Sequence, residues 1–107
     1  MTDQIHDDIE QEAQRIVAAG QAQALLLRLL GGLAVRMHAP SASHRALARS
    51  YPDIDFVTPA RRSHAVEQLI TGLGYAPNKN FNLLNGHSRL LFYDHSHSRQ
   101  IDVFVGQ

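Results

Sequence analysis

The 107-residue chain contains no cysteine, so disulfide bonds and thiolate metal sites are both excluded. It also has no formal net charge, because ten Lys and Arg residues balance ten Asp and Glu residues when histidine is neutral. A broad basic surface that neutralises nucleic-acid phosphates is therefore not expected. A local positive site for a small anionic ligand is still compatible with this balance.

Long hydrophobic runs are also missing. The longest, "ALLLRLLGGLAV" (24–35), is interrupted by Arg28 and two glycines and is shorter than a membrane span. The first residues, "MTDQIHDDIEQEAQ", are polar and acidic, which is the opposite of a secretory signal. We therefore expect a cytoplasmic protein that does not bind a membrane.

The length suits a single domain, and an apolar fraction of 44% predicts a modest core. We expect residues 1–20 to form an N-terminal amphipathic helix that packs on a domain formed by residues 21–107. The acidic residues near the start of this helix favour its dipole, and Gly20 is its expected end. The apolar side chains that share its buried face are Ile5, Ile9, Ile16 and Val17.

The rest of the chain alternates between strand and helix patterns. A strand is expected to begin near Leu25, although the propensities of Ala and Leu favour a helix there. A short helix over 32–39, a loop before residue 53 and a strand over 53–58 follow. The clearest helix is "PARRSHAVEQLITGLGY" (59–75), which has Gly72 and Gly74 at its end. Its expected buried stripe is Val66, Leu69, Ile70 and Leu73.

Three short strands are expected in the last third of the chain, over 81–84, 89–93 and 100–105. Asn85-Gly86 lies between the first two and indicates a hairpin, because both residue types tolerate positive φ. The sequence "DHSHSR" (94–99) indicates a second hairpin connection. Together these elements predict an α+β domain with a mixed sheet of about five strands flanked by helices.

Two aspartates stand in the strand "DIDFVT" (53–58), where alternation places Asp53 and Asp55 on one face. Their Cα atoms would lie roughly 6.6–6.8 Å apart. Asp102, in "QIDVFV", would join them if the last strand lies beside this one. Two such charges at 4 Å repel by about 4 kcal/mol at an effective dielectric of 20, so the group needs a cation or raised pKa values. Carboxylate oxygens suit Mg²⁺, and two such ions can clamp an in-line displacement at phosphorus.

A phosphate-binding segment is expected at Gly31-Gly32. Glycine lets the backbone approach a ligand, and the following helix would direct free N–H groups at an anion. Arg36, on that helix, either contacts phosphate or is a surface arginine. Arg49, four residues before Asp53, is expected to pair with a carboxylate or with the triphosphate.

The order "GGLAVRMHAP…RSYPDIDFVTP…LGY…FNLLNGHSRLLFY…IDVFV" resembles the nucleotidyltransferase fold of the DNA polymerase beta superfamily. It is most similar to small bacterial proteins that include AbiEii-type toxins and related uncharacterised members. The resemblance covers about residues 23 to 105. It implies that Gly31 and Gly32 form the helix-start motif, that Asp53 and Asp55 bind the metal ions, and that Asp102 completes the site and activates the acceptor.

The resemblance implies a Mg²⁺-dependent enzyme, with Mn²⁺ as an alternative ion, that moves a nucleoside monophosphate from a triphosphate to a hydroxyl. The acceptor would be an RNA end, a protein or a small molecule, and a toxin-type role is one form of this function. Family members normally continue into a C-terminal helical region, and we expect this domain to lack that region.

The alternative function is a non-catalytic nucleotide-binding or protein-interaction domain that retains the fold. The last strand has no helix after it to cover it. An open edge strand invites pairing with another chain, so we expect a homodimer or a partner subunit to bind through the C-terminal edge.

Overall fold

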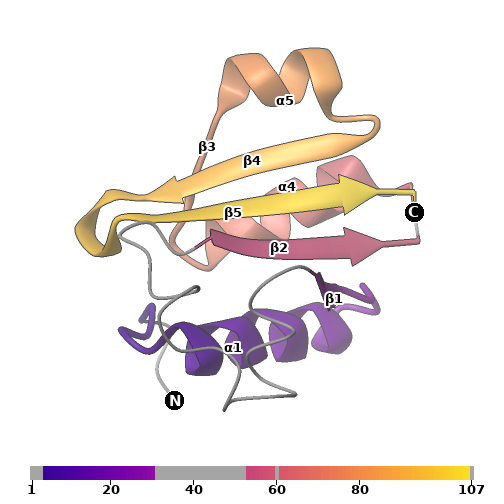
Figure 1. The fold of residues 1–107 in the computed structure, drawn as a ribbon. Coiled ribbons are helices and arrows are strands. Elements are labelled where there is room, and N and C mark those ends of the chain that lie inside the picture. The colour runs from indigo at the N-terminus through magenta and orange to yellow at the C-terminus, as the bar shows by residue number, and fades with distance from the viewer. Residues whose placement is uncertain (1–3, 31–52, 60, 107) are drawn as a thin grey trace.

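Five strands form one mixed sheet in the order β1-β2-β5-β4-β3 (Figure 1). The computed structural model describes residues 4–30, 53–59 and 61–106. β2 and β5 are parallel, and the other neighbouring strands are antiparallel. The strands are β1 (Arg28–Leu30), β2 (Asp53–Thr58), β3 (Ala76–Pro77), β4 (Arg89–Asp94) and β5 (Arg99–Val105). This architecture confirms the expected α+β class and the mixed sheet of about five strands.

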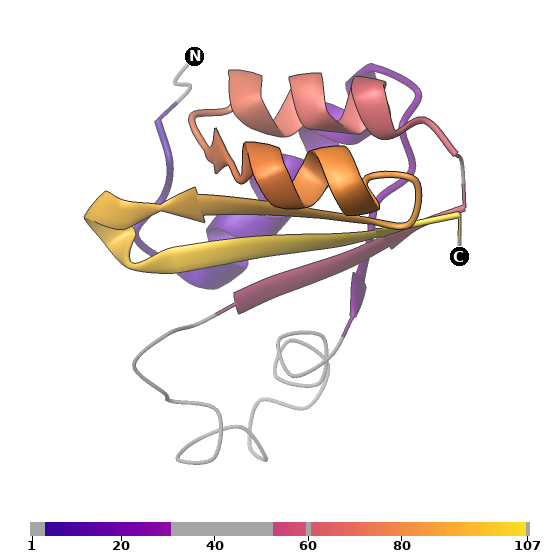
Figure 2. The same cartoon turned by 90° about the horizontal axis from the view of Figure 1, so that it is seen from above.

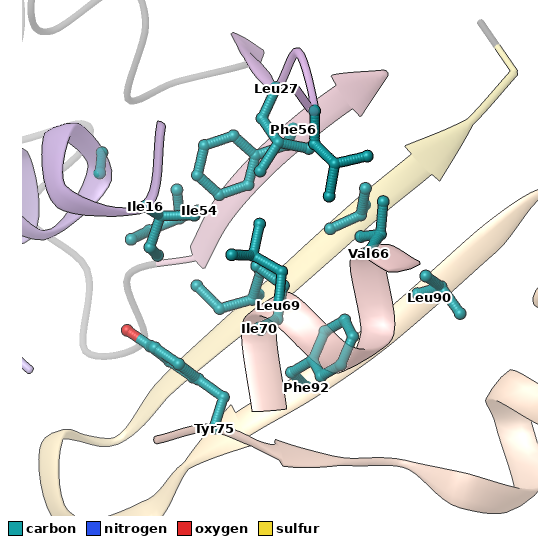
Figure 3. Packing of buried hydrophobic residues seen from close by; sticks show 14 of the residues in the cluster. Ile16, Leu27, Ile54, Phe56, Val66, Leu69, Ile70, Tyr75, Leu90 and Phe92 are labelled. Carbon is teal, nitrogen blue, oxygen red and sulfur yellow. The ribbon is translucent and has the colours of Figure 1, made fainter. Parts of the chain in front are cut away.

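Helices α1 (Ile9–Ala22) and α4 (Ser63–Gly72) supply the core on one face of the sheet. Ile16 of α1 and Ile70 of α4 are fully buried with Ile54 and Phe56 of β2, as Figure 3 shows. The turned view in Figure 2 shows α4 on one side of the sheet. Of the stripe expected on this helix, Val66, Leu69 and Ile70 are buried and Leu73 is partly buried. None of the described helices is long and apolar enough to cross a membrane.

Helix α1 begins and ends later than the sequence predicts. It begins at Ile9 because the carboxylate of Asp8 accepts the backbone N–H of Glu10 at 3.1 Å and caps the helix. Gly20 does not end it, which corrects the expectation. Its carbonyl accepts the N–H groups of Gln23 and Leu25, and a Cβ at residue 20 would lie only 2.7 Å from the Leu25 carbonyl oxygen. Residue 20 therefore has to be glycine because the backbone at Leu25 passes close to it, not because the helix ends there.

The strand expected near Leu25 is shorter than predicted. Leu25 and Leu27 are buried, but regular pairing with β2 begins only at Arg28. The expected short helix over 32–39 and the loop that follows it lie outside the described residues.

The strand predicted over 81–84 is wrong, and so is the hairpin at Asn85-Gly86. Helix α5 (Lys79–Asn85) occupies this segment, and the side chain of Asn78 caps it by accepting the N–H of Phe81 at 3.1 Å. Asn82 is buried against β4, where its side chain accepts the N–H of Leu91 and donates to the Leu91 carbonyl. These bonds satisfy the backbone N–H and carbonyl of Leu91, next to the two residues of β4 that pair with β3. The fifth strand of the sheet is β3.

The last strand is not an open edge, so the expectation of an exposed edge strand at the C-terminal end is wrong, while the expected partner chain stays a prediction. β5 lies between β2 and β4 because the β4–β5 hairpin uses one of its edges and parallel pairing with β2 uses the other. The "DHSHSR" connection does form this hairpin, and Ser98 adopts a positive φ of 50° within it. Among the described strands, β1 and β3 are the outer ones. A partner chain therefore cannot add to the sheet at β5.

Candidate functional site: an acidic sheet face

The sheet face opposite the α1–α4 core carries the three predicted carboxylates. Asp53 and Asp55 alternate with the buried Ile54 and Phe56 along β2, so the aspartates point away from the core. In the parallel β2–β5 ladder Asp55 lies directly opposite Asp102, so both carboxylates are on the same face. We call this surface the acidic face. The expectation that the last strand lies beside "DIDFVT" is thus confirmed.

The three positions differ in their exposure to solvent. Asp53 is exposed, Asp55 is half-buried and Asp102 is only 4% exposed. Partial burial raises the pKa of Asp53, and the charge of Asp102 raises it further. Burial also raises the pKa of Asp55, as do the charges of Asp102 and Asp53, while Arg89 acts in the opposite direction. The two β2 carboxylates are therefore held where their negative charge is unfavourable.

Asp102 is bound by an arginine from the neighbouring strand. Arg89 of β4 donates from Nε to one carboxylate oxygen of Asp102 at 2.9 Å and from Nη2 to the other at 2.6 Å. This is the two-bond geometry in which arginine recognises a carboxylate. The hydrogen bond to Asp102 is the main cause of the raised pKa of Arg89. Asp102 thus has a protein cation as its partner.

Two aromatic rings flank this arginine. Its guanidinium carbon lies 5.5 Å from the ring centre of Phe81 on α5 and 5.1 Å from that of Phe104 on β5. Both distances fall within the range of cation–π contacts, which favour a planar guanidinium in a fixed position. Phe81 and Phe104 thus help to hold Arg89 beside Asp102.

The carboxylates of the acidic face fit a divalent cation only in part. In the part of the chain that the structure describes, no three or more Asp, Glu or His side chains are close enough together to hold a metal ion. Asp53 and Asp55 are carboxylates from one strand face, and hard oxygen ligands of this kind suit Mg²⁺. Both oxygens of Asp102 are engaged by Arg89 in this structure, and the metal site expected at Asp53, Asp55 and Asp102 stays a prediction.

The predicted phosphate-binding residues Gly31, Gly32, Arg36 and Arg49 lie outside the described residues. Their placement relative to the acidic face stays a prediction.

Arg89 was missed by the sequence reasoning, although a signal for it exists. In the β4–β5 hairpin, Asp94 pairs with Arg99 next to the connection. Each step away from the connection pairs the preceding residue of β4 with the following residue of β5. Counting back from "DHSHSR" with this register pairs Arg89 with Phe104 and Leu91 with Asp102. Arg89 and Asp102 are then diagonal neighbours on one face, at a separation that a long side chain can bridge.

The pKa shifts of the acidic face predict how stability depends on pH. An aspartate whose folded pKa is above its unfolded value destabilises the fold once pH exceeds both values. We expect Asp55→Asn to raise the free energy of unfolding of the cation-free protein at pH 7. The difference from wild type should shrink as pH falls from the raised folded pKa toward the ordinary value of 3.8. Urea unfolding between pH 7 and pH 4 measures it.

Asp94→Asn provides a comparison of opposite sign. Burial alone would raise the pKa of Asp94, but hydrogen bonds from Ser96 and His97 outweigh it and leave the pKa lowered. Its stabilising contribution is present above 3.8 and is lost as pH falls through the folded pKa. This substitution should therefore lower stability at pH 7. A destabilised Asp55→Asn protein at pH 7 would contradict the charge repulsion described for the acidic face.

Comparison with known proteins gives no relative for this chain: no family model, no curated protein and no solved structure matches it. The chemistry of the acidic face is therefore the basis for a functional inference.

Proposed function

We propose that the protein is a nucleotidyltransferase that binds a divalent cation and a nucleoside triphosphate at the acidic face. The observation that carries this proposal is the parallel pairing of β2 with β5, which sets Asp55 opposite Asp102 with Asp53 on the same face. The resemblance of the sequence to the nucleotidyltransferase fold of the DNA polymerase beta superfamily supports the same function. Mg²⁺, or Mn²⁺ in its place, would neutralise the charge of the phosphates.

The residues have distinct roles in this proposal. Asp53 and Asp55 hold the cation, whose charge offsets the repulsion between the two carboxylates. Gly31-Gly32 seats the phosphates, with Arg36 and Arg49 as further phosphate contacts. The oxygen of the acceptor hydroxyl forms a bond to the α-phosphorus, the bond to pyrophosphate breaks, and the hydroxyl proton leaves to a base. Asp102 is the residue that the family resemblance suggests as this base. The acceptor is an RNA end, a protein hydroxyl or a small molecule, and a toxin-type role is included.

A second candidate function has its own support. Both oxygens of Asp102 are bonded to Arg89, which is an unusual state for a carboxylate that must serve a cation or accept a proton. This pairing favours a domain that binds nucleotide or another protein through the same fold without transferring a nucleotidyl group. Because β5 is a central strand, such a domain would not bind its partner through the C-terminal edge.

Binding and transfer assays test the proposal and separate the two candidates. We expect wild type to bind ATP, CTP or GTP in the presence of Mg²⁺ and to transfer the labelled nucleotidyl group to one of a set of RNA, protein and small-molecule acceptors. Asp53→Asn/Asp55→Asn should weaken cation-dependent nucleotide binding by at least about 100-fold. Loss of a residue that only supports a metal ligand already lowers metal affinity by up to about 100-fold, and this variant removes two proposed ligands.

Asp8→Asn is the matched control, because asparagine is also a good helix N-cap and the change removes one carboxylate away from β2. Nucleotide binding without transfer to any acceptor would favour the second candidate. Equal binding by wild type and the double variant would exclude a nucleotide or cation site at the acidic face.

A further inference from the structure

The Arg89–Asp102 pair occupies the position where the third carboxylate of a cation site is expected. The side chain of Asp102 is 6% exposed and that of Arg89 is 42% exposed, so the carboxylate is buried beneath the arginine. Each carboxylate oxygen accepts one N–H of the guanidinium. A dication that approaches Asp102 therefore meets a positive charge already bonded to both oxygens.

The surroundings of Arg89 make this contact persistent. Phe81 and Phe104 lie against the guanidinium, and Phe104 is the cross-strand partner of Arg89 in the β4–β5 ladder. A buried carboxylate that loses its partner is strongly unfavourable, so Asp102 is not released without a replacement charge. Another cation at the same oxygens would provide one.

We infer that Arg89 is a positioning residue that withholds Asp102 from the cation, so that a divalent ion at the acidic face is held by Asp53 and Asp55 alone while the pair is intact. This inference rests on the proposed cation site. The carboxylates of β2 and β5 share one face, and no three such side chains among the described residues form a group that could hold a metal ion. Displacement of Arg89 is the step that would add the third ligand.

The wild-type protein tests this directly. In protein labelled with ¹³C at the aspartate carboxylates, a titration with Mg²⁺ alone should shift the Cγ signals of Asp53 and Asp55. The Cγ signal of Asp102 should stay in place, because its oxygens remain on Arg89. Since this measurement needs no variant, it decides the question even if a substitution at residue 89 prevents folding.

Arg89→Met adds a second test by freeing Asp102. We expect the Asp102 signal to shift with Mg²⁺ and the apparent affinity for Mg²⁺ to rise by at least about tenfold, because cation affinity increases with the number of charged ligands. Arg28→Met is the matched control. Arg28 pairs with Val57 in the β1–β2 ladder, on the same face as Asp55, so its loss removes one positive charge without touching Asp102. This control should leave the Asp102 signal in place.

The outcomes separate the inference from the proposed function. Shifts of all three aspartates in wild type would overturn the inference and leave the cation site standing. An Asp102 signal that stays unshifted in folded Arg89→Met would also overturn it. If Asp53 and Asp55 do not respond to Mg²⁺ in wild type, the proposed cation site itself fails, and the inference fails with it.

Discussion

Replacing Glu12 with alanine is expected to lower the free energy of unfolding by about 3–5 kcal/mol, the cost of breaking a buried ion pair by removing one partner. Glu12 lies on α1 and is fully buried. Its carboxylate accepts Nε and Nη2 of Arg15 at 2.8 and 2.9 Å, the backbone N–H of His6 at 3.0 Å and the hydroxyl of Tyr75 at 2.8 Å. Burial alone would raise the pKa of Glu12, but these hydrogen bonds together outweigh it and leave the pKa lowered.

The size of this effect follows from the groups that would lose their partner. Tyr75 is 2% exposed, so its hydroxyl would be left buried without an acceptor in place of Glu12. Glu12 also joins His6, before α1, and Tyr75, three residues after the end of α4, to the helix. Chemical denaturation at pH 7 measures the loss.

Gln14→Ala is the control for Glu12→Ala, because residue 14 is an exposed position of the same helix and should change stability by no more than about 0.5 kcal/mol. A loss below about 1 kcal/mol in Glu12→Ala would show that the buried network contributes little. Its stabilisation should also decline in acid, since a lowered pKa means that the contribution disappears as pH falls through the folded value.

Phe56→Ala is the second large effect, with an expected loss of about 3–5 kcal/mol. Phe56 is fully buried on the core face of β2, between the half-buried Asp55 and Val57 of the acidic face. Figure 3 shows Phe56 among the core side chains, with Leu27 beside it. Truncation removes the apolar surface of the ring and leaves a cavity that the sheet cannot close, because β2 is held by β1 on one side and β5 on the other.

Denaturant unfolding of Phe56→Ala and Phe56→Leu measures this effect. Leucine refills part of the space and should cost clearly less than alanine. Leu83→Ala is the control, since Leu83 is 84% exposed on α5 and should change stability by no more than about 0.5 kcal/mol. An alanine variant as stable as wild type would mean that β2 does not depend on this side chain for its position.

These two positions show how the protein can support an unfavourable acidic face. Asp53 and Asp55 carry charges that oppose folding when no cation is present. The core face of β2 and the hydrogen-bond network of Glu12 on α1 stabilise the fold. Their contribution offsets the repulsion between the aspartates. Sites whose own charges are destabilising are typical of functional positions, which is consistent with the proposed cation and nucleotide binding.

The sequence by itself determined the features that depend on local periodicity. The two-residue alternation of "DIDFVT" and "QIDVFV" placed Asp53 and Asp55 on one face of their strand and Asp102 on the face of its own strand that it shares with Phe104. The same reasoning located β4, β5, the connection between them and the buried stripe of α4. Each of these follows from residues close together in the chain.

Tertiary structure decided the features that depend on contacts between distant residues. The 81–84 segment is a helix because Asn78 caps it and Asn82 bonds to β4. Whether a short apolar run becomes a helix or a strand is thus decided by the residues that it contacts in the fold. Glu12, one of the acidic residues near the start of the first helix, is a buried partner of Tyr75 because α1 packs beside α4, and Tyr75 lies three residues after that helix. The register of the β4–β5 hairpin brings Arg89 to Asp102, whereas the parallel pairing of the distant strands β2 and β5 brings Asp55 to Asp102. The alternation within each strand thus predicts the positions of the carboxylates of the acidic face. The arginine that neutralises Asp102 reaches it through the pairing of β4 with β5.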